Sequence, residues 1–204
     1  MNRKYVYLMC VVLVLMASQC FAMGGTPPAQ EGASMPKNVN VIVVMQTSKG
    51  TMKLELYPDK APVTVQNFLS YVDRGFYDGT IFHRVMPNFM IQGGGFEKGM
   101  AQKPVSSPIK NEAGNSLTND RGTIAMARTT DVDSATAQFF INVADNTFLN
   151  HQNDTSQGFG YCVFGKVIDG MDTAYAISMV QTHTLGYFDD VPVEDVVIMS
   201  VKRI

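Results

Sequence analysis

One short stretch of the chain, residues 82–94, combines a cation, large apolar side chains and an amide: Arg84, then Phe89 and Met90, then Gln92. A guanidinium is always charged and donates hydrogen bonds in a rigid geometry. Beside a dry apolar recess it would stabilise a group that becomes a hydrogen-bond acceptor only during a reaction. The ordinary alternative is that Arg84 is a solvated or ion-paired surface residue. In that case Phe89 and Met90 belong to the core.

Motifs for other chemistry are missing from the sequence. It has no Cys-x-x-Cys pair, no Walker-type glycine loop and no Gly-x-Ser-x-Gly elbow. Its histidines, His83, His151 and His183, lack metal-ligand spacing. His83 neighbours Arg84 in a predicted strand, so it should face the other way in a structural role. No helical run directly follows Gly93–Gly95, which favours a tight turn over a phosphate cradle. No metal or cofactor is expected.

Four stretches in chain order resemble the signature of the cyclophilins. They are Phe82–Gly94 (FHRVMPNFMIQGG), Gly122–Arg128 (GTIAMAR), Ser134–Asn142 (SATAQFFIN) and Gly160–Val167 (GYCVFGKV). The likeness extends from about Val41 to the C-terminus and is greatest to the periplasmic bacterial branch. It implies a mainly β fold, a closed eight-stranded antiparallel barrel capped by two α-helices. It also implies peptidyl-prolyl cis-trans isomerase activity on proline-containing, unfolded or partly folded polypeptides.

The resemblance gives each matching residue an expected role. Arg84 is similar to the catalytic arginine of the family. By the same likeness Phe89, Met90, Phe140 and Leu149 would line a proline pocket, and Gln92 would support the arginine and the substrate backbone. Ala127, Arg128 and Gln138 would border the bound peptide. Taken without the motif, Gln92 is equally well a turn residue and Arg128 a surface charge.

Three features depart from many eukaryotic members of that family. Phe148 stands where they carry Trp, and without an indole N–H it should weaken cyclosporin binding. Tyr161 stands where they carry His, and its ring can still wall the pocket. We expect both residues to contact substrate. The polar loop at residues 150–158 is also a few residues longer than in similar chains.

Isomerisation of an X–Pro bond suits such a set of residues. The bond rotates against a barrier of about 18–20 kcal/mol because twisting removes amide resonance. In the twisted state the proline nitrogen becomes a hydrogen-bond acceptor, which a fixed guanidinium can satisfy. A 10⁴-fold acceleration requires only about 5.5 kcal/mol. One charge-assisted hydrogen bond and an anchored ring can supply this without a covalent intermediate.

The elements that must position these residues are short. Residues 39–45 and 51–57 predict a hairpin, since Met52, Leu54 and Leu56 alternate with Lys53 and Glu55. The run from Pro62 to Gly75 predicts a helix, and a second helix is expected over residues 171–178. Further strands are expected, at residues 80–85, 89–92, 122–127, 138–143, 161–167 and 195–202. Many short strands with two helices indicate a barrel or a sandwich.

The N-terminus has the layout of an export signal. Arg3 and Lys4 precede an apolar run, and Cys20 and Ala22 occupy the small-residue positions before a cut after Ala22. We therefore expect a signal peptide (1–22), a flexible Gly- and Pro-rich tether (23–38), an isomerase domain (39–204) and a periplasmic location. A membrane anchor and a lipoprotein are the weighed alternatives, but the apolar run is shorter than about 20 residues. Cys162 would be the one cysteine left, a buried inert thiol.

Composition limits the range of partners. The formal net charge is −2, so there is no basic surplus to neutralise a phosphate backbone, and nucleic acid is not an expected partner. A monomer without stable membrane insertion is expected after cleavage. The competing functional interpretation is a binding module or holdase for extended apolar peptides.

Overall fold

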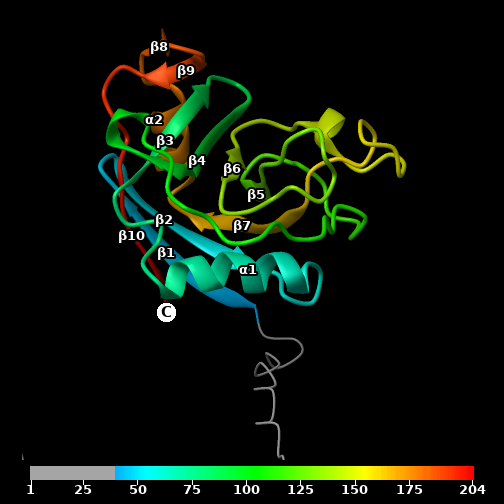
Figure 1. Cartoon of the computed structure of the whole chain (residues 1–204). Coiled ribbons are helices and arrows are strands. Elements are labelled where there is room, and N and C mark those ends of the chain that lie inside the picture. The colour runs from blue at the N-terminus through cyan, green and yellow to red at the C-terminus, as the bar shows by residue number, and fades with distance from the viewer. Residues whose placement is uncertain (1–39) are drawn as a thin grey trace, which may run out of the picture. The chain divides into compact units, whose positions relative to one another are not determined.

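The computed structural model describes residues 40–204 (Figure 1). The predicted signal peptide and tether lie outside the described residues. Within residues 40–204, no helix combines the length and the apolar character needed to cross a bilayer.

Eight strands form a nearly closed antiparallel barrel. They are β1 (Val41–Thr47), β2 (Gly50–Leu56), β3 (Thr80–Met86), β4 (Met90–Glu97), β5 (Thr123–Met126), β6 (Phe139–Asn142), β7 (Val163–Asp169) and β10 (Ile198–Arg203). Their order in the sheet is β10-β1-β2-β7-β5-β6-β4-β3. A bridge between Ile81 on edge strand β3 and Val197, just before edge strand β10, brings the two edges together. The Phe82 amide also donates to the Val196 carbonyl at 2.9 Å. The predicted barrel architecture is confirmed.

The inside of the barrel is a packed core. The expected alternation on β2 is observed, with Met52, Leu54 and Leu56 fully buried. Helix α1 (Pro62–Asp73) covers one end of the barrel (Figure 1) and buries Phe68 against the core. The Phe68 ring lies 5.2 Å from the Phe164 ring. Side chains therefore fill the barrel, and a ligand has to bind on its outer surface.

Helix α1 begins where the chain provides hydrogen-bond acceptors and ends close to a glycine. Pro62 opens α1, and the Glu112 carboxylate accepts hydrogen bonds from the amides of Val63 and Thr64 at 3.2 and 2.8 Å. This carboxylate satisfies two of the free N–H groups of the first turn. The helix ends before Gly75, whose φ is +63°. The second helix, α2 (Met171–Ser178), coincides with its predicted range.

The prediction of a tight turn at Gly93–Gly95 is wrong, because these glycines lie inside β4. The strand passes so close to its neighbours that side chains would not fit. A Cβ at Gly94 would lie 2.8 Å from the Phe139 ring, and one at Gly95 would lie 2.5 Å from the Gln138 side chain. Gly94 also has a φ of +81°. These glycines therefore allow close backbone approach within an irregular strand.

A β-bulge in β3 breaks the alternation on which the orientation of His83 was predicted. Phe82 pairs with Gly93 and Arg84 pairs with Gln92, so His83 is an extra residue on β3. Phe82 is fully buried inside the barrel. Strict alternation would have sent Arg84 to the same face as Phe82. The bulge instead brings Arg84 to the outer surface, and His83 and Arg84 line one hollow rather than opposite faces.

A small hairpin outside the barrel was not predicted. Strands β8 (Thr182–Leu185) and β9 (Phe188–Pro192) form a separate two-stranded sheet. It lies beside β3, at the side of the barrel away from α1 (Figure 1). Most residues of the hairpin are exposed. A strand with no buried face needs no alternation of apolar and polar residues, so no pattern in the sequence predicts it. Two single-turn helices, η1 (Lys98–Met100) and η2 (Thr147–Leu149), complete the elements.

Candidate active site

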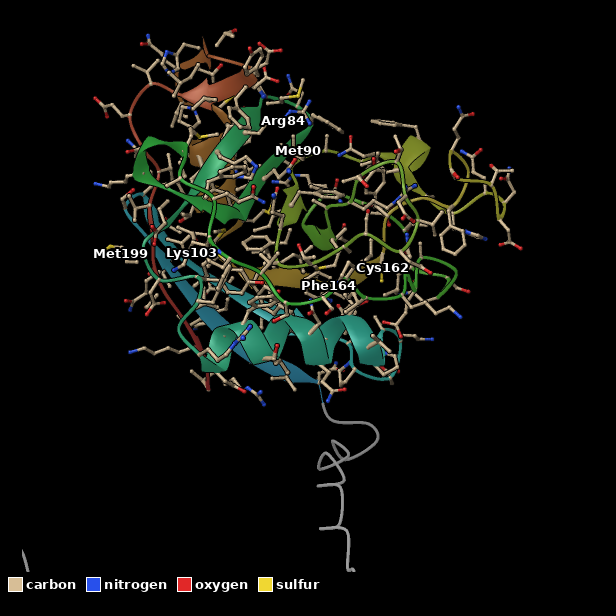
Figure 2. The ribbon with its side chains drawn as sticks, in the orientation of Figure 1. Arg84, Met90, Lys103, Cys162, Phe164 and Met199 are labelled. Atoms are coloured by element: carbon tan, nitrogen blue, oxygen red, sulfur yellow. The ribbon has the colours of Figure 1, made fainter. Side chains whose placement is uncertain are left out.

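The outer face of β3–β6 carries a pocket of about 140 Å³. Most of the predicted site residues meet there: Arg84, Phe89, Met90, Gln92, Ala127, Arg128, Phe140, Leu149 and Tyr161. Two predicted residues lie outside it. Gln138 lies in an adjoining hollow, and Phe148 is an exposed residue at the rim. Figure 2 shows Arg84 and Met90 close together on the side of the barrel away from α1.

The apolar part of the pocket is a second hydrophobic cluster, separate from the barrel core. Its buried members are Met90, Ala125, Phe140 and Val163. The Tyr161 ring meets the Phe140 ring edge-on at 5.7 Å. The inner side of this cluster packs against the barrel, and its outer side faces the pocket. It can take a small apolar ring and remove water from it.

Arg84 stands at the polar edge of this apolar surface. Its Nη2 group donates to the Met86 sulfur at 3.2 Å. Its Nε lies 3.5 Å from a carboxylate oxygen of Asp190 on β9. The Arg84 side chain is 41% exposed, so it is held from two sides and still reachable by a ligand. A cation fixed next to a dry recess is the arrangement required for a hydrogen bond that strengthens during a reaction.

Two glutamines connect the pocket to the adjoining hollow. The Gln92 side-chain amide donates to the Gln138 side-chain oxygen at 3.0 Å. Gln92 is paired with Arg84 across the β3–β4 ladder. This amide is therefore fixed beside the guanidinium, within a strand rather than in a turn.

Arg128 lines the pocket, but its hydrogen bonds go to the protein itself. Its guanidinium donates to the carbonyls of Gly160, Thr129 and Ser156, each at 2.9 Å. It also lies 4.9 Å above the centre of the Tyr161 ring. Arg128 thus fastens the long loop at residues 150–158 and the Tyr161 wall to one another. Arg128 therefore holds the pocket wall in shape, and its guanidinium is already engaged by protein carbonyls rather than directed at a ligand.

Phe148 extends the apolar rim of the site. It is 65% exposed and stacks on the Phe89 ring at 5.6 Å with an interplanar angle of 25°. A large exposed aromatic ring costs free energy in water unless something covers it. The Phe89–Phe148 pair therefore forms an apolar shelf leading into the pocket.

A buried asparagine network supports the pocket, and the sequence analysis did not identify it. The Asn146 side-chain amide donates to the Phe89 carbonyl at 2.9 Å and to the Asn142 side-chain oxygen at 2.7 Å. Asn119 donates to the Leu149 carbonyl at 3.2 Å. These bonds fix the backbone of two lining residues. Asparagine is usually a surface or turn residue, so its type gave no signal of burial.

Two buried ionisable groups lie near the pocket without entering it. Burial lowers the pKa of His83 to about 4, and its ring packs on Phe96 at 4.6 Å. Burial likewise raises the pKa of the Cys162 thiol to about 11, which keeps it protonated at neutral pH. The prediction that Cys162 is buried is confirmed. Both groups are uncharged at neutral pH, so neither supplies a charged donor at the pocket edge.

Comparisons with known proteins identify the family. The sequence profile described as "Cyclophilin type peptidyl-prolyl cis-trans isomerase/CLD" matches residues 42–203. The chain is 58% identical to peptidyl-prolyl cis-trans isomerase B of Escherichia coli over 160 residues, covering 78% of this chain and 98% of that one. It is 57% identical to a peptidyl-prolyl cis-trans isomerase of Acinetobacter baylyi over 163 residues, covering 80% and 85%.

Solved structures agree with this assignment. A cyclophilin-type isomerase of Cryptosporidium parvum superposes with a TM-score of 0.67 at 25% identity, covering 81% of this chain and 98% of that chain. The same protein was also solved in the presence of the dipeptide Ala-Pro, with a TM-score of 0.65, covering 79% and 97%. The chain belongs to the cyclophilin-type peptidyl-prolyl cis-trans isomerases and is an enzyme of that activity.

Proposed function

We propose that this isomerase holds a substrate proline in the pocket and uses Arg84 to stabilise the twisted X–Pro bond. The observation that carries this assignment is the position of Arg84, a cation held at the edge of a pocket of about 140 Å³ floored by Met90 and Phe140. The proline ring is anchored on the apolar floor while the preceding carbonyl turns. As the nitrogen pyramidalises, its lone pair accepts a hydrogen bond from the guanidinium, which is stronger in that state than in the planar amide.

The test follows isomerisation of a proline-containing tetrapeptide by wild type, Arg84→Ala and Arg84→Lys. We expect kcat/KM to fall roughly 100-fold in Arg84→Ala, which corresponds to about 2.7 kcal/mol. Lysine should recover only part of the loss because it lacks the rigid planar donor. Arg121→Ala is the control, since Arg121 lies outside the pocket and the adjoining hollow. Equal rates for wild type and Arg84→Ala would refute the role of Arg84.

We also propose that the enzyme works on exported proteins in the periplasm. The family match begins at residue 42, and the residues before it contain the basic, apolar and small-residue regions of an export signal. Fractionation of the native host with N-terminal sequencing tests this. The expected product is a processed chain that begins at Met23 outside the cytoplasm. An unprocessed chain in the cytosol would contradict it.

A holdase activity on extended apolar peptides is the second candidate function, because Phe148 and Tyr187 expose large rings close to the site. Aggregation of a reduced, unfolded protein would be followed by light scattering. Suppression that survives Arg84→Ala but is lost in Phe140→Ala supports this function. Loss of suppression in Arg84→Ala counts against it.

A further inference from the structure

A second, larger hollow adjoins the pocket. Its volume is about 540 Å³, and it shares Arg84, Gln92 and Arg128 with the pocket. The hairpin β8–β9 forms one wall of it, through residues 187–190. The pocket itself has room for little more than a ring. A polypeptide seated there must extend beyond the pocket, and the shared residues lead toward the hairpin.

The hairpin presents apolar side chains to solvent on a fixed base. Tyr187 is fully exposed, and Leu185 and Phe188 are more than one-third exposed. The base is fixed because Val191 is buried and the Phe188 ring meets Phe96 edge-on at 5.4 Å. Exposed apolar groups that adjoin a binding pocket are typical of an interaction surface. An anchored wall also loses little conformational entropy when it binds.

We propose that the β8–β9 hairpin binds the segment of substrate next to the proline, an extended polypeptide that places an apolar or aromatic side chain against Tyr187. The proposal rests on the proposed function, because it needs a proline in the pocket. The occupant follows from the continuity of the two hollows through Arg84 and Gln92. Short peptides reach only the pocket, whereas long chains reach both.

The experiment compares kcat/KM for a proline-containing tetrapeptide and for a proline-limited refolding protein, using full-length wild type and Tyr187→Ser. We expect Tyr187→Ser to lower the value for the protein substrate about fivefold more than the value for the tetrapeptide. Tyr175→Ser is the matched control, because Tyr175 is a half-exposed tyrosine on α2 outside both hollows. An unchanged ratio of the two values would overturn the hairpin proposal. Failure of wild type to turn over the tetrapeptide would instead refute the proposed function.

An independent observation concerns Asp190. This residue has a φ of +59°, a region that residues other than glycine enter at a cost of order 1–3 kcal/mol. In that conformation its carboxylate lies 3.5 Å from the Nε of Arg84. No other carboxylate within residues 40–204 forms an ion pair with Arg84. The structure assigns Asp190 as a positioning residue that fixes the Nε edge of the guanidinium and leaves Nη1 and the second N–H of Nη2 to the substrate.

The test uses Asp190→Asn, because asparagine tolerates the left-handed region while losing the charge. We expect kcat to fall three- to tenfold with KM nearly unchanged, and the ¹⁵Nε resonance of Arg84 to shift and broaden. Asp169→Asn, which removes a carboxylate paired with Lys53, is the control for charge. An unchanged or raised kcat with an unmoved Arg84 resonance would overturn the assignment. Thermal unfolding checks that both variants are folded.

Discussion

The two hydrophobic clusters of the barrel use the same strands and similar residues but differ in what they do. Phe139 and Phe140 are neighbours on β6, and both are at least 96% buried. Phe139 packs inside the barrel against Phe68 and Tyr77, whereas Phe140 packs outside against Tyr161. The inner cluster fills the barrel, whereas the outer one forms the floor of a pocket on the barrel surface. Burial of a residue therefore does not distinguish a core from a binding site, but the enclosure of its cluster does.

The inner cluster gives the largest expected effect. Phe139→Ala should lower the free energy of unfolding by about 3–5 kcal/mol, because truncation leaves a closed cavity among rings that cannot collapse into it. Urea denaturation measures the change. Phe148→Ala serves as the control for loss of an aromatic ring at an exposed position. A loss below about 1 kcal/mol for Phe139→Ala would break the contrast between the clusters.

The matching substitution in the outer cluster, Phe140→Ala, should affect activity more than stability. Phe140→Ala enlarges a pocket that is already open. We therefore expect the free energy of unfolding to fall by at most about 2 kcal/mol, from the lost burial of apolar area alone. Its kcat/KM on a tetrapeptide should fall at least roughly tenfold, or about 1.4 kcal/mol, because the proline loses its floor. If Phe140→Ala destabilises the fold as much as Phe139→Ala, the two clusters are one core.

The close packing of β4 on the inner cluster provides a second test. Gly94→Ala and Gly99→Ala both place a side chain at positive φ, at +81° and +77°. A Cβ at Gly94 meets Phe139 and Tyr77 at 2.8–2.9 Å, whereas one at Gly99 meets nothing within 4 Å. Gly94→Ala should therefore cost about 1–3 kcal/mol more in thermal or urea unfolding than Gly99→Ala. Equal losses of unfolding free energy in the two variants would mean that β4 shifts freely to make room for the added methyl group.

Acid should give a smaller effect than Phe139→Ala, through His83. Its pKa is about 4 in the folded state and 6.5 when solvated, so the unfolded chain binds a proton more readily below pH 6.5. Stability should therefore fall as pH drops, by about 2 kcal/mol between pH 7 and pH 5. Urea unfolding of wild type and His83→Gln across that range measures the difference. Parallel pH profiles for the two proteins would show that His83 does not carry the effect.

Strand alternation and clear helix start and stop residues predicted a barrel or a sandwich, and the resemblance to the cyclophilins selected the barrel. It located the pocket lining through motif position, since Phe89, Met90 and Phe140 cannot be told from core residues by type. Three features could not be predicted from the sequence. The bulge at His83 depends on pairing between two strands, the asparagine network depends on burial, and the β8–β9 hairpin lacks an apolar alternation. Each is a property of contacts between segments.

The bulge at His83 also shows how a charged side chain can be placed on the outside of a stable barrel. If β3 kept strict alternation through residues 82–84, Arg84 would share the inward face with Phe82, where an unpaired charge costs several kcal/mol. The bulge lets two successive residues, His83 and Arg84, face the same side while the pairing of the following residues continues unchanged. In a design setting, one inserted residue rather than a redesigned surface would suffice to present a cation on the outside of a closed sheet. By the same register, deletion of residue 83 would leave Arg84 paired with Gln92 and still facing outward, so the extra outward position belongs to the bulge itself.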